Sequence, residues 1–233
     1  MQHAPASSSP VHGGLAAVIF DLDGVLVTTD RYHYEAWKDI ADASGLPFDE
    51  TVNHLLRGVS RAESLRRIYA AAAVPLPDDS VFQDQLRRKN DRYVALIEQM
   101  GTDDILPGAV PLLQALRAAG IRTAVASASR NAPLVLERTG LHPWLDAVAD
   151  GSMVQASKPD PEVFLLAAEL LACAPGHCVG VEDAAAGVEA IHQAGMVAVG
   201  VGAQAAAADI QVADTAELSI ELLRDACISK LQS

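Results

Sequence analysis

The sequence is poor in cysteine, and its few cysteines form no recognisable pattern. Three are present, Cys173, Cys178 and Cys227, and no two of them make a CxxC pair. An odd number without such a pair argues against a disulfide framework and against a cysteine metal or redox site. Free cysteine is among the most buried residue types, so we expect three reduced side chains inside the fold.

Positive charge and long apolar runs are also scarce. The chain has 17 Lys and Arg against 30 Asp and Glu, for a formal charge of -13. Such a surface repels nucleic acid and anionic membranes, so we expect neither as a partner, and an anionic substrate has to find a local basic pocket. The longest apolar stretch, residues 163–174, contains Glu169 and is too short to cross a bilayer. We expect no membrane span.

The first residues carry no recognisable targeting signal. Residues 1–14 are rich in Ser, Pro, Ala and His, with neither a basic start and apolar run nor an Arg-rich amphipathic pattern. We therefore expect a flexible tail there and a cytoplasmic protein.

What is present is the composition of a globular chain with a large core. Of the 233 residues, 50% are hydrophobic and 20% are charged, which excludes a disordered, collagenous or coiled-coil protein. No repeat occurs at solenoid spacing. The length fits one large domain, or a core that carries an inserted subdomain, and we expect a monomer.

Strand and helix patterns alternate along most of the chain. An almost wholly apolar run, residues 15–20, is typical of a strand buried on both faces of a parallel sheet. Later strands are predicted at 121–126, 145–149, 177–181 and 196–201, and helices at 109–119, 133–139, 161–171 and 184–194. This alternation predicts an α/β fold with a doubly wound parallel sheet, whose ligand site lies at the carboxyl ends of the strands.

Residues 29–100 differ, because their periodicity is helical throughout. Helices are predicted at 34–43 and 80–100, and a capping box of Ser60 with Glu63 predicts the start of another between them. No convincing strand pattern occurs there. The segment is therefore expected to be an all-helical insert.

This change of pattern predicts two domains. The catalytic α/β core is expected to consist of residues 15–28 and 101–233, and the helical cap of residues 29–100. The linkers between them are predicted at residues 27–30 and 101–107.

Acidic side chains follow two of the predicted strands. Asp21 and Asp23 stand two residues apart after the first strand, and Glu182 and Asp183 follow the fourth. A D-x-D-G sequence by itself is an ordinary turn. Four carboxylates at one edge of a sheet, however, repel one another unless a cation lies between them, and hard oxygen ligands suit Mg²⁺. The sequence therefore predicts a magnesium site.

Phosphate-binding groups follow other strands. Residues 127–131, Ser-Ala-Ser-Arg-Asn, offer hydroxyl groups, backbone N–H groups and a guanidinium near a helix N-terminus. Lys158 precedes Pro159 on a rigid turn, where a point charge suits a phosphoryl group. Each feature alone is also an ordinary helix cap or surface lysine.

These four features, in this order at the ends of successive strands, resemble the haloacid dehalogenase superfamily of aspartyl phosphotransferases. Within it, the chain is similar to the β-phosphoglucomutase family through the motifs D-L-D-G-V at 21–25, Y-H-Y-E-A-W-K at 32–38, L-R-G-V-S-R at 56–61, R-K-N-D at 88–91 and L-E-R at 136–138. The likeness extends from about residue 15 to about residue 224.

The resemblance implies roles for the residues of the site. Asp21 is expected to be the nucleophile that becomes a phosphoaspartate, and Asp23 the general acid and base for the sugar hydroxyl. Magnesium is expected on Asp21, the backbone carbonyl of Asp23, Glu182 and Asp183. The transferring phosphoryl group is expected to contact Ser127, Ala128 and Lys158, and the other phosphate Arg61, Ser129, Arg130 and Asn131.

The resemblance also implies contacts from the helical insert. Its sugar-recognition residues are expected to be Arg57, Gly58, Val59 and Ser60, with Lys89 and Asn90 as a second contact. His33 and Trp37 are four residues apart and share a helix face, which the family turns toward the core. There His33 is expected to orient Asp23. Packing is the alternative for both residues, and it is favoured for Trp37.

The activity implied is isomerisation of a sugar phosphate. Phosphorylated Asp21 donates to β-glucose 1-phosphate, and the resulting glucose 1,6-bisphosphate returns its other phosphoryl group, leaving glucose 6-phosphate. A sugar-phosphate phosphatase, with the same nucleophile and water as the acceptor, is the first alternative. A catalytically inactive phosphosugar-binding module is the second. In each case the partner is a small sugar phosphate.

Three positions depart from the family's usual residues. Thr28 replaces an Asp in the first hinge, Arg57 a Lys in the insert, and Arg130 a Lys at the distal phosphate. Arginine is a good and often bidentate phosphate ligand, so Arg130 is expected to keep that function. Thr28 leaves the hinge behaviour open, and Arg57 leaves the sugar preference open.

Overall fold

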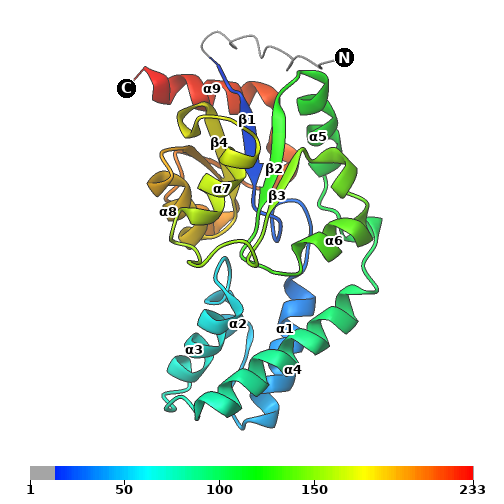
Figure 1. Ribbon diagram of the computed structural model, residues 1–233, viewed down its shortest axis with the longest axis vertical. Coiled ribbons are helices and arrows are strands. Elements are labelled where there is room, and N and C mark those ends of the chain that lie inside the picture. The colour runs from blue at the N-terminus through cyan, green and yellow to red at the C-terminus, as the bar shows by residue number, and fades with distance from the viewer. Residues whose placement is uncertain (1–13, 233) are drawn as a thin grey trace, which may run out of the picture.

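The computed structural model describes residues 14–232, and at its centre is a six-stranded, wholly parallel sheet (Figure 1). The strand order is β3-β2-β1-β4-β5-β6, so the chain starts in the middle and winds out to both edges. The strands are Ala17–Phe20 (β1), Arg122–Ala126 (β2), Ala147–Ala149 (β3), Cys178–Glu182 (β4), Val197–Val201 (β5) and Ile210–Val212 (β6). The predicted doubly wound α/β fold is thereby confirmed.

Helices cover both faces of the sheet, which explains why β1 is apolar throughout. One face carries α5 (Ala109–Ala118), α6 (Ala132–Thr139) and α9 (Ile220–Leu231), and the other carries α7 (Glu162–Leu170) and α8 (Ala185–Gln193). Successive side chains of a strand point to opposite faces. Val18 and Phe20 accordingly pack in the first layer, and Ala17 and Ile19 in the second.

The segment between β1 and α5 contains four α-helices beyond the carboxyl edge of the sheet (Figure 1). We call residues 30–97 the helical region; it holds α1 (Asp30–Ala43), α2 (Glu50–His54), α3 (Arg61–Ala71) and α4 (Asp79–Ile97). It has its own apolar cluster, which includes Trp37, Ile68 and Phe82. The whole region is described and contains no strand, as expected. The two-domain division and its linkers stay predictions.

Two helix ends differ from the predicted positions by three residues or more. α1 begins at Asp30, four residues earlier than expected. α4 ends at Ile97 and does not continue to residue 100. There the N–H groups of Gln99 and Met100 donate to carbonyls three residues back, which tightens the chain out of the α-helix.

Three elements and one capping motif were not predicted correctly. No sequence pattern predicted α2, β6 or α9; β6 is three residues long, too short for its alternation to be distinctive. The predicted capping box forms only in part: Ser60 Oγ accepts the Glu63 N–H at 3.3 Å, whereas the Glu63 carboxylate pairs with Arg67 Nε at 3.2 Å.

The three cysteines are free, and two of them lie in the core. Cys178 and Cys227 are buried as expected, whereas Cys173 is only half-buried. Within residues 14–232 no helix has the length and apolar character needed to cross a membrane. The predicted N-terminal tail falls almost wholly outside the described residues.

Candidate active site

Three carboxylates meet at the carboxyl edge of the sheet because β1 and β4 are neighbours. Phe20 pairs with Val181, so the next residue of each strand, Asp21 and Glu182, arrives at the same edge, followed by Asp183. One oxygen of each of these three side chains lies within 4.8 Å of the others. We call Asp21, Glu182 and Asp183 the acid cluster.

Lys158 lies inside this cluster. Its ammonium Nζ is 2.5 Å from Asp21 Oδ1 and 2.8 Å from Glu182 Oε2, and its side chain is fully buried. Burial alone lowers the pKa of Lys158, but the attraction of the two carboxylates outweighs it and raises the pKa above its usual value. Lys158 is therefore charged and pairs with two of the three carboxylates.

One ammonium does not balance three carboxylates. Burial, followed by repulsion from Asp21, raises the pKa of Glu182 well above its usual value and that of Asp183 to about 7. The remaining negative charge and the hard oxygen donors fit a divalent cation such as Mg²⁺, which removes this repulsion on binding. Asp21, Glu182 and Asp183 are the side chains placed to hold it.

Gly24 lies directly against the acid cluster, a role the sequence analysis missed. Its φ is +83°, and a Cβ added there would be 2.3 Å from Asp183 Oδ2. The glycine of the D-x-D-G motif therefore provides both the positive φ and the space for Asp183. The glycine that ends the D-x-D-G motif was the available signal.

Replacing Gly24 with alanine is expected to weaken divalent-cation binding by at least tenfold, because the new methyl displaces Asp183. It also costs about 1 kcal/mol or more through the positive φ. Gly45→Ala is the matched control, since Gly45 has φ +66° and nothing within 4 Å of its added Cβ. Titration with Mn²⁺ and thermal unfolding separate the two effects. Equal Mn²⁺ affinities in both variants would contradict the packing argument.

Asp23 bonds to a residue that the sequence analysis did not single out. Thr29 Oγ1, in the turn before α1, donates to Asp23 Oδ1 at 2.5 Å. Burial, followed by repulsion from Asp21, raises the pKa of Asp23 to about 6, although the hydrogen bond from Thr29 opposes the shift. Asp23 therefore gains or loses a proton close to neutral pH.

His33 is oriented by the helical region. Its Nδ1 is 2.9 Å from Lys89 Nζ, and its ring packs on Tyr93 with centroids 4.2 Å apart. Among the described residues, the side-chain hydrogen bond of the His33 ring is to Lys89, and the side-chain hydrogen bond to the Asp23 carboxylate comes from Thr29. Burial and the nearby Lys89 lower the pKa of His33 well below its usual value. Nδ1 of a neutral His33 can accept a hydrogen bond from the Lys89 ammonium.

Lys89 is itself buried, with 3% of its surface exposed. Burial, followed by repulsion from Arg61, lowers the pKa of Lys89 to about 7. Its ammonium lies 5.0 Å from the ring centroid of Trp37 and 4.3 Å from that of Tyr93. Trp37 is 2% exposed and belongs to the core of the helical region, as its packing alternative predicts.

A cavity of about 690 Å³ separates the acid cluster from the helical region. All the predicted site residues line it except Ser127 and Glu182, which are buried behind its wall. The predicted residues in the lining are Asp21, Asp23, His33, Trp37, Arg57, Gly58, Val59, Ser60, Arg61, Lys89, Asn90, Ala128, Ser129, Arg130, Asn131, Lys158 and Asp183. The tertiary structure thus gathers residues separated by more than 150 positions.

The loop at residues 127–131 forms the wall opposite the helices. Ser127 Oγ accepts the N–H of Ser129 at 3.1 Å, and Ser129 Oγ accepts that of Asn131 at 3.2 Å. These bonds fold the loop into a compact turn ahead of α6. Asn131 Nδ2 also donates to Asn90 Oδ1 at 3.0 Å, which ties the loop to α4.

Two guanidinium groups approach the cavity from opposite sides. Arg61 comes from the start of α3, and Arg130 from the loop before α6. Burial, followed by repulsion from Arg130, lowers the pKa of Arg61. Like charges held so close are typical of a site that binds an anion. The cavity therefore has an acidic end with Lys158 and a basic end with Arg61 and Arg130.

The fold and the acid cluster place the chain in a known class. Residues 15–195 match the family of haloacid dehalogenase-like hydrolases, and the chain belongs to that family. The β-phosphoglucomutase of Bacillus subtilis strain 168 is 42% identical over 214 residues, covering 91% of this chain and 95% of that protein. The resemblance predicted from the motifs is confirmed.

Two further relatives show the range of the family. The crystal structure of β-phosphoglucomutase from Clostridium difficile has a TM-score of 0.89 and 36% identity, over 94% of this chain and 100% of that one. A phosphorylated carbohydrates phosphatase from Thermotoga maritima is 32% identical over 184 residues, covering 78% of this chain and 82% of that protein. Mutases and phosphatases are thus both similar to this chain.

Proposed function

We propose that the protein is a β-phosphoglucomutase, which converts β-glucose 1-phosphate to glucose 6-phosphate through a phosphoaspartate and glucose 1,6-bisphosphate. The observation that carries the proposal is a single cavity with two anion-binding ends. Lys158 and the acid cluster are at one end, and Arg61 and Arg130 at the other. A sugar with a phosphate at each end fits this arrangement. The likeness to two β-phosphoglucomutases supports it.

In this proposal Asp21 forms the covalent bond. Its carboxylate attacks phosphorus, so a bond from a carboxylate oxygen to phosphorus forms as the bond to the sugar oxygen breaks. Lys158 holds Asp21 in place and neutralises charge on the transferring group. A bound Mg²⁺ supplies further positive charge to the phosphoryl oxygens.

Asp23 moves the proton in each half of the reaction. It donates a proton to the sugar oxygen that leaves phosphorus, and it accepts one from the hydroxyl group that attacks the phosphoaspartate. Thr29 holds its carboxylate between the two steps. The bisphosphate has to turn around between these steps, so that each phosphate occupies each end of the cavity once.

The helical region is proposed to act as a cap that covers the cavity. Its loop between α2 and α3, together with Lys89 and Asn90 on α4, forms the wall opposite the sheet. Excluding water protects the phosphoaspartate from hydrolysis and directs it to the sugar. A sugar-phosphate phosphatase is the second candidate, favoured by the Thermotoga maritima relative. It uses the same residues but admits water.

The decisive experiment measures both products at once. Purified protein is given β-glucose 1-phosphate, Mg²⁺ and a trace of glucose 1,6-bisphosphate, and glucose 6-phosphate is compared with free phosphate. A large excess of glucose 6-phosphate is the expected result. Predominant phosphate release identifies the phosphatase, and binding without either product identifies an inactive phosphosugar-binding module.

Arg130→Ala is expected to raise the KM for the sugar phosphate by about tenfold, because one charge-assisted contact to the distal phosphate is lost. Turnover at saturation is expected to fall less, since Asp21 and its partner Lys158 are unchanged. The exposed Arg138 on α6 does not line the cavity, and Arg138→Ala serves as the control. Steady-state kinetics check the prediction, and an unchanged KM for Arg130→Ala would contradict it.

A further inference from the structure

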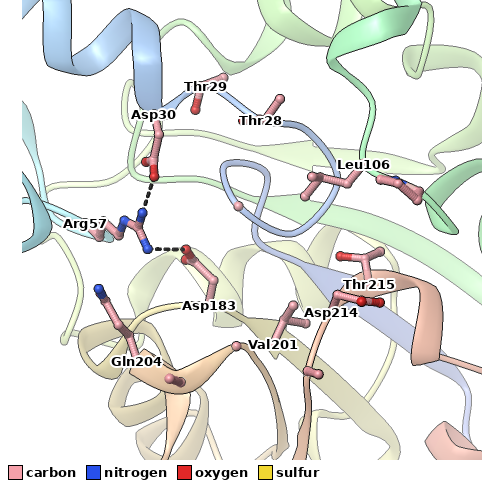
Figure 2. Close-up of a pocket in the computed structure, with 15 residues that line it drawn as sticks. Thr28, Thr29, Asp30, Arg57, Leu106, Asp183, Val201, Gln204, Asp214 and Thr215 are labelled. Carbon is pink, nitrogen blue, oxygen red and sulfur yellow. Dashed lines mark hydrogen bonds and ion pairs between the residues drawn. The ribbon is translucent and has the colours of Figure 1, made fainter.

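A second cavity, of about 350 Å³, is lined by Asp183 of the acid cluster (Figure 2). It is bounded by the turn before α1 and by the loops that follow β5 and β6. Four of its residues, Thr29, Asp30, Arg57 and Asp183, also line the first cavity. These four residues therefore form the partition between the two cavities.

Arg57 crosses this partition between two carboxylates. Figure 2 shows its guanidinium between Asp30 and Asp183. Nη2 pairs closely with Asp30 Oδ2, whereas Nη1 is 3.9 Å from Asp183 Oδ2, beyond hydrogen-bonding distance. The Arg57 Nε atom is buried and has no hydrogen-bond partner in the described structure. The arginine is thus bound firmly on one side only.

The position of Arg57 matters because Asp183 belongs to the acid cluster. A guanidinium that pairs fully with Asp183 competes with a divalent cation, both by occupying a carboxylate oxygen and by repelling the cation. Asp30, the first residue of α1, draws Arg57 to the opposite side. The open space of the second cavity allows the guanidinium to shift between the two carboxylates.

We propose that Asp30 is a positioning residue that holds Arg57 away from Asp183 and so keeps Asp183 available to a divalent cation. The inference rests on the cation site of the proposed function. Asp30 and Arg57 both lie in the helical region, whereas Asp183 follows β4. The strength of the Asp30–Arg57 pair therefore determines how strongly the Arg57 guanidinium, from the helical region, competes with a cation for Asp183.

The test measures Mn²⁺ binding without sugar phosphate, by the electron paramagnetic resonance signal of free Mn²⁺. Asp30→Asn is expected to weaken binding by about three- to tenfold, the scale of a partly exposed ion pair. Arg57→Ala is expected to strengthen binding by a similar factor. The double variant is expected to bind Mn²⁺ like Arg57→Ala, because Asp30 acts through Arg57. Asp30→Glu is expected to restore near-normal binding.

A matched control separates positioning from simple loss of charge. Asp214 lines the same cavity, but its carboxylate accepts the N–H of Ala216 and does not contact Arg57. Asp214→Asn removes the same charge and keeps this helix cap, so Mn²⁺ affinity is expected to stay within about twofold of the wild type. If Asp30→Asn weakens binding equally with and without Arg57, or does not weaken it, the inference is wrong.

The Mg²⁺ dependence of activity is a second measurement, and a purely structural role of Asp30 would leave it unchanged. In Asp30→Asn the half-saturating Mg²⁺ concentration is expected to rise about three- to tenfold, with near-normal turnover at saturating Mg²⁺. Reduced turnover that saturating Mg²⁺ does not restore would overturn the inference. If the wild-type protein does not bind Mn²⁺, the proposed cation site is wrong as well. If the wild type binds Mn²⁺ and Asp30→Asn binds it with the same affinity, only the inference about Asp30 is wrong.

Discussion

Replacing Asp21 with asparagine is expected to abolish both glucose 6-phosphate formation and phosphate release, by at least about 10³-fold. The amide differs from the carboxylate by one atom, but it has no ionised oxygen to attack phosphorus. The variant is expected to fold, because the change removes one of three repelling carboxylates and leaves Lys158 paired with Glu182. Both outcomes are measured on the same sample, by product assay and by thermal unfolding.

The covalent step has its own measurement. Incubation of the wild type with acetyl phosphate is expected to give a phosphoaspartate at residue 21, detected by mass spectrometry after trapping, and Asp21→Asn is expected to show none. Asp103→Asn, at an exposed position that lines neither cavity, is the control and is expected to label normally. Turnover retained in Asp21→Asn would overturn the nucleophile assignment and the mechanism built on it.

Asp23→Asn is expected to lower mutase turnover by about 10²- to 10⁴-fold, the usual contribution of a general acid and base. Asp21, Glu182 and Asp183 remain, so Mn²⁺ affinity is expected to stay close to that of the wild type. The asparagine oxygen still accepts the hydroxyl hydrogen of Thr29. The loss is therefore expected in the chemical step and not in the structure of the site.

Comparing two leaving groups shows whether the lost turnover of Asp23→Asn comes from lost acid–base catalysis. Acetyl phosphate releases a weakly basic acetate that needs no proton, whereas a sugar hydroxyl leaves as a strong base unless it is protonated. Phosphorylation of Asp23→Asn by acetyl phosphate is therefore expected to be nearly as fast as that of the wild type. Its turnover of the sugar phosphate is expected to be much slower than that of the wild type. An equal loss with both donors would show that Asp23 has a different role.

Together these two variants test whether Asp21 and Asp23 have different roles, one as the nucleophile and the other as the general acid and base. Asp21 is held by the buried Lys158, whereas Asp23 is held by the hydroxyl of Thr29 in the turn before α1. The first contact lies within the sheet edge, and the second joins that edge to the start of the helical region. Movement of the helical region is therefore expected to act on Asp23 more than on Asp21.

The amino-acid sequence alone determined the sheet and which side chains meet at its carboxyl edge. The apolar run that became β1 and the alternation after residue 108 predicted the parallel sheet, because burial on both faces requires continuous apolar strands. Parallel strands bring their carboxyl ends to one edge, so the sequence alone predicts that Asp21 and Asp183 lie close together. The motifs, taken together, also predicted the family.

Other contacts were decided only by the tertiary structure. Thr29 against Asp23, Gly24 against Asp183, and Arg57 between Asp30 and Asp183 follow no period of the sequence. The contacts of Thr29 and Arg57 depend on how the helical region sits over the sheet edge, whereas that of Gly24 depends on how closely the turns after β1 and β4 approach each other. Local patterning specifies strands, helices and their ends, because it reports burial along one element. Contacts between elements depend on the packing of the whole chain, and that is where the second cavity and its arginine arise.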